Sequence, residues 1–246
     1  MNKKNIIILY GLVALLCVLE SSNINYNLNF CDVILIKVYG VNKESTIMNI
    51  FNWITLYMLI IANISIYIEN TMINEKSYIW ILRYKSYTKW ILYTIKNILI
   101  IIIRDLTIFY MFLCLFSFIF TQNFDGTSEY FKQLNDCQVY DSIGIMYVVI
   151  QYLLSMVCIS NLALLQILIT LFFNNFKYGM VCHILIVIIS ATIAKAGGFN
   201  PVMLSRYNII DSTSVNYPTV TIIVGIIINI FIAGILVVFM KKRIRR

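Results

Sequence analysis

Between two long apolar runs, residues 69–90 read ENTMINEKSYIWILRYKSYTKW. Four Lys or Arg residues outnumber two Glu residues in this segment, and five Tyr or Trp residues are interspersed among the charges. The apolar runs on either side, residues 46–68 and 91–120, reach the roughly 20 residues that a helix needs to cross the hydrocarbon core of a bilayer. The polar segment is therefore expected to connect two transmembrane helices.

The composition of the whole chain supports a membrane location. Of 246 residues, 61% are apolar and only 12% are charged, and the mean hydropathy is +0.85. A soluble globular domain is typically about half apolar and a quarter charged. Two prolines and nine glycines leave little room for flexible linkers. The chain is therefore predicted to be an all-α integral membrane protein with one domain, residues 1–246, in a lipid bilayer.

Six transmembrane helices are predicted, at residues 5–19, 46–68, 91–120, 142–173, 179–196 and 220–240. Residues 91–120 exceed a simple crossing, and we expect one long helix whose first two turns lie in the cytoplasmic interface. Residues 142–173 are also over-long, which leaves open a tilted or kinked single span or two short helices. Residues 33–39 are apolar but too few to span, so we expect them at the membrane interface.

The distribution of positive charge sets the orientation of these six helices. With both termini in the cytoplasm, the cytoplasmic segments hold twelve Lys or Arg residues and the outer loops hold four. Such a bias is typical of membrane proteins, whose cytoplasmic loops are enriched in Lys and Arg. Residues 69–90 are then cytoplasmic. The net charge of +8 is explained by topology, so no nucleic-acid partner is expected.

Motifs for catalysis are absent from the sequence. No G-x-x-x-x-G-K-[ST] occurs, so the chain is not expected to hydrolyse ATP itself. His183 is the only histidine, and no two of the six cysteines have C-x-x-C spacing, which argues against a metal or redox site. The sequence therefore predicts neither an enzyme nor a bound cofactor. Cys31 and Cys137 fall in the predicted outer loops, where a disulfide between them is one alternative.

Several polar residues fall inside the predicted spans. Arg104 and Asp105 are adjacent, so on a helix they point about 100° apart and are expected not to face each other. Their functional interpretation is a polar position at a helix interface or along a substrate path. The alternative is that Arg104 extends to the cytoplasmic headgroups. Asp105 is the only clear buried acid, which weakens the case for a proton-coupled secondary transporter.

Uncharged polar residues in the spans are expected to hydrogen-bond between helices. These residues are Gln151, Asn161, Gln166 and Asn229. His183 is expected to be a hydrogen-bonded packing residue.

The cytoplasmic segment has a moderately amphipathic pattern. Plotted as a helix over residues 77–89, it places uncharged residues such as Trp80 and Tyr84 on one side and most of the charges on the other. Ile79 and Leu82 fall on the charged side, where apolar side chains suit docking into a partner's groove. The alternative is a basic surface helix that only anchors the edge of the membrane.

Residues 74–90, NEKSYIWILRYKSYTKW, together with six spans in about 245 residues and a Gly/Asn-Pro break at residues 197–201, resemble a known family. The chain resembles the permease subunits of ABC-2 type transporters. It is most similar to small permeases of bacteriocin- or lantibiotic-immunity systems in low-GC Gram-positive bacteria. One departure is the segment before the first span, which is too short for the gate helix of that family.

The resemblance implies a multi-pass permease in a bacterial cell membrane. Residues 77–89 would form a coupling helix in a cleft of a separate cytoplasmic ABC ATPase dimer, which binds the ATP. The implied coupling residues are Glu75, Tyr78, Ile79, Leu82, Arg83 and Tyr84. The permease would work with a second copy or a sister permease. A short re-entrant hairpin would precede the last span on the outer side.

The sequence therefore leaves two alternative functions. The first is the export of a substrate such as an antimicrobial peptide or another amphipathic compound, driven by the partner ATPase. The second is an immunity or sensor membrane protein that binds a peptide or a signalling partner without transport. A membrane enzyme or a secondary transporter would need catalytic or proton-relay residues that the sequence lacks.

Overall fold

The structure is a computed structural model that describes residues 3–22, 28–38, 47–73, 84, 86–121, 144–173, 175–196 and 217–244. These residues are almost entirely helical, and none of them forms a strand. The elements are α1 (Lys3–Ser22), α2 (Phe30–Val38), α3 (Ile47–Ile68), the π-helical turn η1 (Glu69–Ile73), α5 (Tyr87–Phe120), α7 (Gly144–Phe173), α8 (Phe176–Lys195) and α9 (Tyr217–Ile244). The predicted all-α class is confirmed.

Three helices are long and apolar enough to cross a membrane. These stretches are Ile54–Met72, Thr88–Phe120 and Val148–Phe173, in α3 with η1, in α5 and in α7. Three shorter apolar stretches, Asn5–Leu19, Lys177–Ile193 and Ile222–Val238, belong to α1, α8 and α9. The chain is therefore suited to a membrane, while the six-span count stays a prediction.

The two over-long runs each form one helix. α7 is continuous over 30 residues, so this run forms one helix and not two short ones. α5 is continuous over 34 residues and begins at Tyr87, four residues before its predicted start. Ser86 is its N-cap, with extended backbone angles of φ −160° and ψ 129°, and its carbonyl accepts the Trp90 N–H at 3.0 Å. The prediction of one continuous helix over residues 77–89 was therefore wrong at its C-terminal end.

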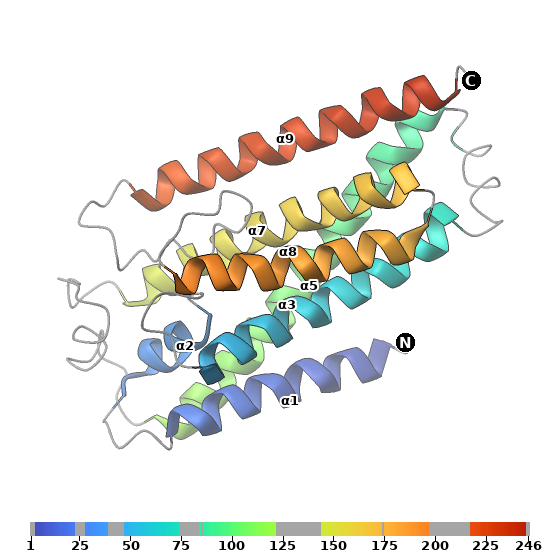
Figure 1. The fold of residues 1–246 in the computed structure, drawn as a ribbon. Helices are drawn as coiled ribbons and strands as arrows, with labels where there is room; N and C mark the ends of the chain where they lie inside the picture. The colour runs from blue at the N-terminus through green and yellow to red at the C-terminus, as the bar shows by residue number, and fades with distance from the viewer. Residues whose placement is uncertain are drawn as a thin grey trace.

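The long helices lie alongside one another and alternate in direction (Figure 1). The start of α1, the start of α5 and the end of α9 share one end of the bundle. α7 is the central helix and contacts α2, α3, α5, α8 and α9, whereas α1 packs mainly on α5. Aliphatic side chains such as Ile60, Ile102 and Leu162 are fully or almost fully buried between these helices.

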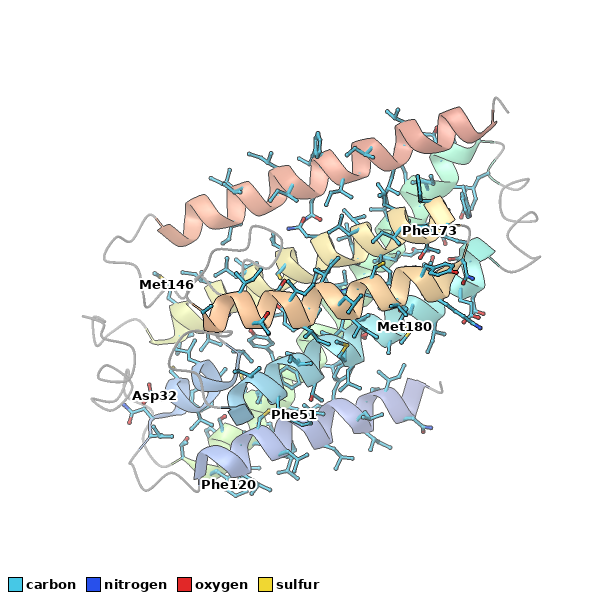
Figure 2. All side chains as sticks on the ribbon, in the orientation of Figure 1. Asp32, Phe51, Phe120, Met146, Phe173 and Met180 are labelled. Atoms are coloured by element: carbon cyan, nitrogen blue, oxygen red, sulfur yellow. The ribbon has the colours of Figure 1, made fainter. Side chains whose placement is uncertain are left out.

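Large apolar side chains also cover the outside of the bundle. Phe51, Phe120 and Phe173 (Figure 2) are 60%, 45% and 53% exposed. Monomeric soluble proteins rarely expose apolar patches this extensive. Hydrocarbon is the solvent that suits such a surface, because it makes no demand for polar groups there.

The short helix α2 is covered by other helices, and its position at the membrane interface stays a prediction. It packs against α1, α3, α5 and α7, and Val33, Ile34 and Leu35 are almost fully buried. It lies at the end of the bundle away from the start of α1 (Figure 1). Its C-terminal carbonyl at Val38 accepts the Gln151 amide N–H at 2.7 Å. The sequence did not predict this burial among other helices.

Gly179 of α8 packs closely against α7. A Cβ added there would overlap the Thr170 hydroxyl of α7 and would lie 3.0 Å from the Gln166 carbonyl oxygen. The absent side chain therefore allows the two backbones to approach, as small residues do in membrane helix pairs.

Gly179→Ala is expected to lower the thermal unfolding midpoint in detergent, because the added methyl overpacks this contact at a cost of about 1–3 kcal/mol. Gly234→Ala is the matched control, since its Cβ would meet nothing within 4 Å. That substitution is expected to leave the midpoint unchanged or to raise it slightly. Equal midpoints for the two variants would contradict the close packing of α7 and α8.

Candidate functional site

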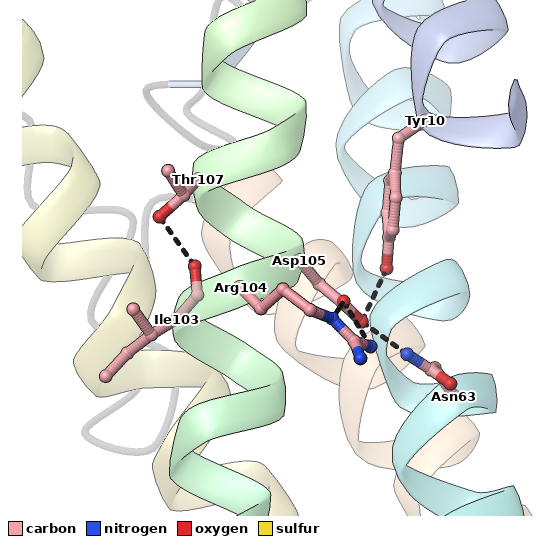
Figure 3. A network of polar contacts seen from close by, with 6 residues as sticks. All are labelled: Tyr10, Asn63, Ile103, Arg104, Asp105 and Thr107. Carbon is pink, nitrogen blue, oxygen red and sulfur yellow. Dashed lines mark hydrogen bonds and ion pairs between the residues drawn. The ribbon is translucent and has the colours of Figure 1, made fainter. Parts of the chain in front are cut away.

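A buried carboxyl group, that of Asp105, lies in the middle of α5 (Figure 3). Its side chain is 0% exposed. The carboxylate oxygen Oδ2 accepts hydrogen bonds from the Tyr10 hydroxyl of α1 at 3.1 Å and from Asn63 Nδ2 of α3 at 2.6 Å. Asp105 therefore joins three helices at one carboxyl group.

The other carboxylate oxygen is bound by the preceding residue. Arg104 Nε donates to Asp105 Oδ1 at 2.8 Å, and Arg104 Nη2 lies 2.7 Å from the same oxygen. The prediction that these two side chains cannot face each other was wrong. Their Cβ atoms do diverge, but the long arginine side chain curves around the helix to reach its neighbour. Arg104 therefore pairs with Asp105 at mid-helix instead of extending to the headgroups.

The pair is electrically neutral, and every oxygen of its buried carboxylate has a donor. A buried charge is tolerated only when it is paired and hydrogen-bonded. Removing one partner leaves the other charge uncompensated, which costs far more than the intact pair contributes. The site therefore holds α1, α3 and α5 in one arrangement, and nothing in it resembles a nucleophile beside a base.

A second polar chain connects α3, α7 and α8. The Ser65 hydroxyl donates to the Ile61 carbonyl at 2.8 Å, so its oxygen accepts the Gln166 amide N–H at 2.6 Å. The Gln166 carbonyl oxygen then lies 3.0 Å from His183 Nδ1. This direction of donation places the proton of His183 on Nδ1. The predicted role of His183 as a hydrogen-bonded packing residue is confirmed.

The remaining polar residues predicted between helices have mixed outcomes. Gln151 and Gln166 bond across helices as described, and Asn229 of α9 donates to Ser160 Oγ of α7 at 2.8 Å. These three expectations are confirmed. Asn161 is 0% exposed, but neither of its amide atoms has a partner among the described residues. No bond to another helix supports the expected role of Asn161.

Asp32 is a second buried acid, which corrects the expectation that Asp105 is the only one. Its side chain is 0% exposed, and its Oδ2 accepts the backbone N–H of Asn29 at 3.1 Å. Asn29 precedes α2, so Asp32 makes the returning bond of a capping box. The spacing Asn29-x-x-Asp32 before an apolar run was the signal that could have revealed it.

Cys31 of α2 is a buried free thiol. Burial, followed by the neighbouring Asp32 carboxylate, raises the pKa of this thiol to about 11. It therefore stays protonated at neutral pH and is a poor nucleophile. Cys137, its suggested disulfide partner, lies outside the described residues.

Most of the predicted coupling residues also lie outside the described parts of the chain. These residues are Glu75, Tyr78, Ile79, Leu82 and Arg83. Tyr84 is described, and its ring packs against Tyr93 of α5 with the ring centroids 4.9 Å apart. Tyr84 lies near the start of α5, whereas Arg104 and Asp105 lie about five turns into that helix.

Tyr10 and Asn63 were missed by sequence reasoning. They are 95 and 42 residues away from Asp105 in the chain, and no local pattern connects them with it.

Comparisons with family models, curated proteins and solved structures give no match.

Asp105→Ala is expected to destabilise the protein by about 3 kcal/mol, the lower end of the range for breaking a buried pair, because Arg104 is 41% exposed. The measurement is the thermal unfolding midpoint in detergent. The double variant Arg104→Leu/Asp105→Leu is expected to recover most of the loss, since it removes both charges. Tyr10→Phe removes one donor and is expected to cost about 1 kcal/mol. A double variant no more stable than Asp105→Ala would argue against the pair.

Proposed function

We propose that this chain is the membrane-spanning permease subunit of an ABC exporter, powered by a separate cytoplasmic ABC ATPase dimer. The observation that carries the proposal is that η1 ends and α5 begins at the same end of the bundle. α1 also starts and α9 also ends there (Figure 1). The same end carries most of the positive charge.

The charge asymmetry of the helix ends supports a cytoplasmic position for the connection between η1 and α5. Within the described residues, its end of the bundle carries Lys3, Lys4, Lys89, Lys177, Lys241, Lys242 and Arg243, and the opposite end carries Lys37 and Lys195. Lys and Arg are enriched on the cytoplasmic side of membrane proteins. Both termini and residues 74–86 are then cytoplasmic.

Helix lengths support six crossings in this proposal. α1 and α8 each contain 20 residues and α9 contains 28. At 1.5 Å per residue, 20 residues extend about 30 Å, which is the thickness of the hydrocarbon core. α2 would then be a re-entrant element on the outer side and not a seventh crossing.

The proposed mechanism transmits ATPase motion through α5. Residues 74–85 engage the ATPase, and Tyr84 packs on Tyr93 in the second turn of α5. α5 runs the length of the bundle and holds α1 and α3 through Asp105. A displacement of Tyr84 would therefore be transmitted to α5 and, through Asp105, to α1 and α3. Two such permease halves, identical or paired with a sister permease, would separate to release an antimicrobial peptide or another amphipathic compound.

The orientation is tested by reporter fusions at the end of the chain. Green fluorescent protein fused after Arg246 is expected to fluoresce, and alkaline phosphatase fused there is expected to be inactive, because both report a cytoplasmic position. Alkaline phosphatase inserted between residues 122 and 143 is expected to be active. The reverse pattern would exclude the proposed position of the connection between η1 and α5.

ATPase coupling is tested by reversing a charge in the proposed contact. Arg83→Glu is expected to abolish the stimulation of the co-purified ATPase, measured as phosphate release in proteoliposomes. Lys177→Glu is the control, since Lys177 is an exposed cation at the same end of the bundle outside the contact. Normal stimulation by Arg83→Glu would overturn the coupling role. Purification in mild detergent without any ATPase would favour the non-transporting immunity or sensor protein.

A further inference from the structure

One face of α5 is partly exposed and carries polar groups at mid-span, and two of these groups, Asn97 and Thr107, bond to Tyr67 of α3 and Tyr152 of α7. Its positions follow alternating steps of three and four residues, the spacing of a helix–helix seam. None of these side chains is buried, and their central members are Arg104 and Thr107. The α5 stripe consists of Tyr93, Asn97, Ile100, Arg104, Thr107, Met111, Cys114 and Phe118.

Arg104 makes this face unsuitable for lipid. It lies 17 residues from Tyr87 and 16 from Phe120, or about 24 Å from either end of α5. Its side chain is 41% exposed, and only Nε and Nη2 bind Asp105. A guanidinium has five N–H donors, and hydrocarbon offers an acceptor to none of those that remain.

The other open faces differ in this respect. The exposed described side chains between Ile7 and Leu19 of α1 are all apolar, and so are those between Ile223 and Val238 of α9. Those two faces suit lipid as they are. Unlike those two faces, the α5 stripe therefore needs a protein or water against it.

We propose that two copies of this chain pack against each other along the α5 stripe, with the two α5 helices parallel across a twofold axis. Copies inserted in the same orientation can pair this helix only in parallel, which brings each stripe residue close to its own counterpart. The alternating three- and four-residue spacing is what a parallel pair of helices requires. The mostly apolar stripe favours a helix neighbour over a water-filled path.

The charges are compatible with this contact. Each Arg104 is already neutralised by its own Asp105, so two copies approach without a net charge on either face. The Thr107 hydroxyl donates to the Ile103 carbonyl at 2.7 Å, so its oxygen is an acceptor for the Tyr152 hydroxyl at 2.9 Å. The hydroxyl oxygen has a second lone pair. In the pair of helices it can accept an N–H of Arg104 from the other copy.

This inference names the interface of the two-half permease proposed above, but its test does not depend on the ATPase. Because native Cys114 is itself a free thiol of the stripe, the test uses a Cys114→Ser background. In that background Met111→Cys is expected to form an intermolecular disulfide in native membranes oxidised with copper phenanthroline. Its rate is expected to exceed that of the Cys114→Ser protein at least about tenfold, because an interface concentrates the two thiols. Phe231→Cys on α9, in the same background, is the matched control, since Met111 and Phe231 are 66% and 67% exposed. It is expected to match the Cys114→Ser protein.

Equal rates for Met111→Cys and Phe231→Cys would overturn the α5 interface. Rapid reaction of Met111→Cys with a membrane-impermeant, water-soluble thiol reagent would also overturn it, because the stripe would then line a water-filled path. As a second measurement, Ile100→Trp is expected to reduce the dimer fraction in mild detergent, whereas Ile227→Trp on α9 is not. A dimer that forms in this way without any ATPase supports the α5 interface even if the exporter function fails.

Discussion

The carboxylate of Asp105 is fully buried, and its hydrogen-bond donors come from the protein itself. Those donors come from α1, α3 and α5. Apolar packing alone does not select among neighbours in a membrane, because lipid tails are as apolar as leucine. A charged oxygen that needs a hydroxyl from one helix and an amide from another does select them. The mutual positions of these three helices therefore depend on this one carboxyl group.

α7 uses weaker bonds of the same kind to organise the other half of the bundle. Gln151 binds the carbonyl end of α2, Gln166 links α3 and α8, and Ser160 accepts Asn229 of α9. Each neighbour thus has its own polar bond to α7. Such bonds contribute only about 0.6–2 kcal/mol each in membranes. These bonds determine which helix packs beside which, whereas the apolar contacts provide most of the surface buried between the helices.

The sequence was sufficient for the class of fold and for most helix positions, because long apolar runs define membrane helices by their length. It was insufficient where burial depends on tertiary structure. The apolar residues of α2 look the same in sequence whether they lie at an interface or between four helices. Tyr10 and Asn63 meet Asp105 only after α1 and α3 have packed on α5. The adjacent pair Arg104 and Asp105 was misjudged because backbone directions were considered without the reach of the arginine side chain.

The buried position of α2 has a consequence for how the protein is made. α2 leaves the ribosome long before the helices that cover it, since Val38 and its partner Gln151 are 113 residues apart. At about 5–20 residues per second, that interval is roughly 6–23 s of synthesis. During this time Asp32 and the C-terminal carbonyls of α2 lack their final surroundings. Until α5 and α7 have been made and cover α2, water at the membrane surface is the solvent that can satisfy these groups.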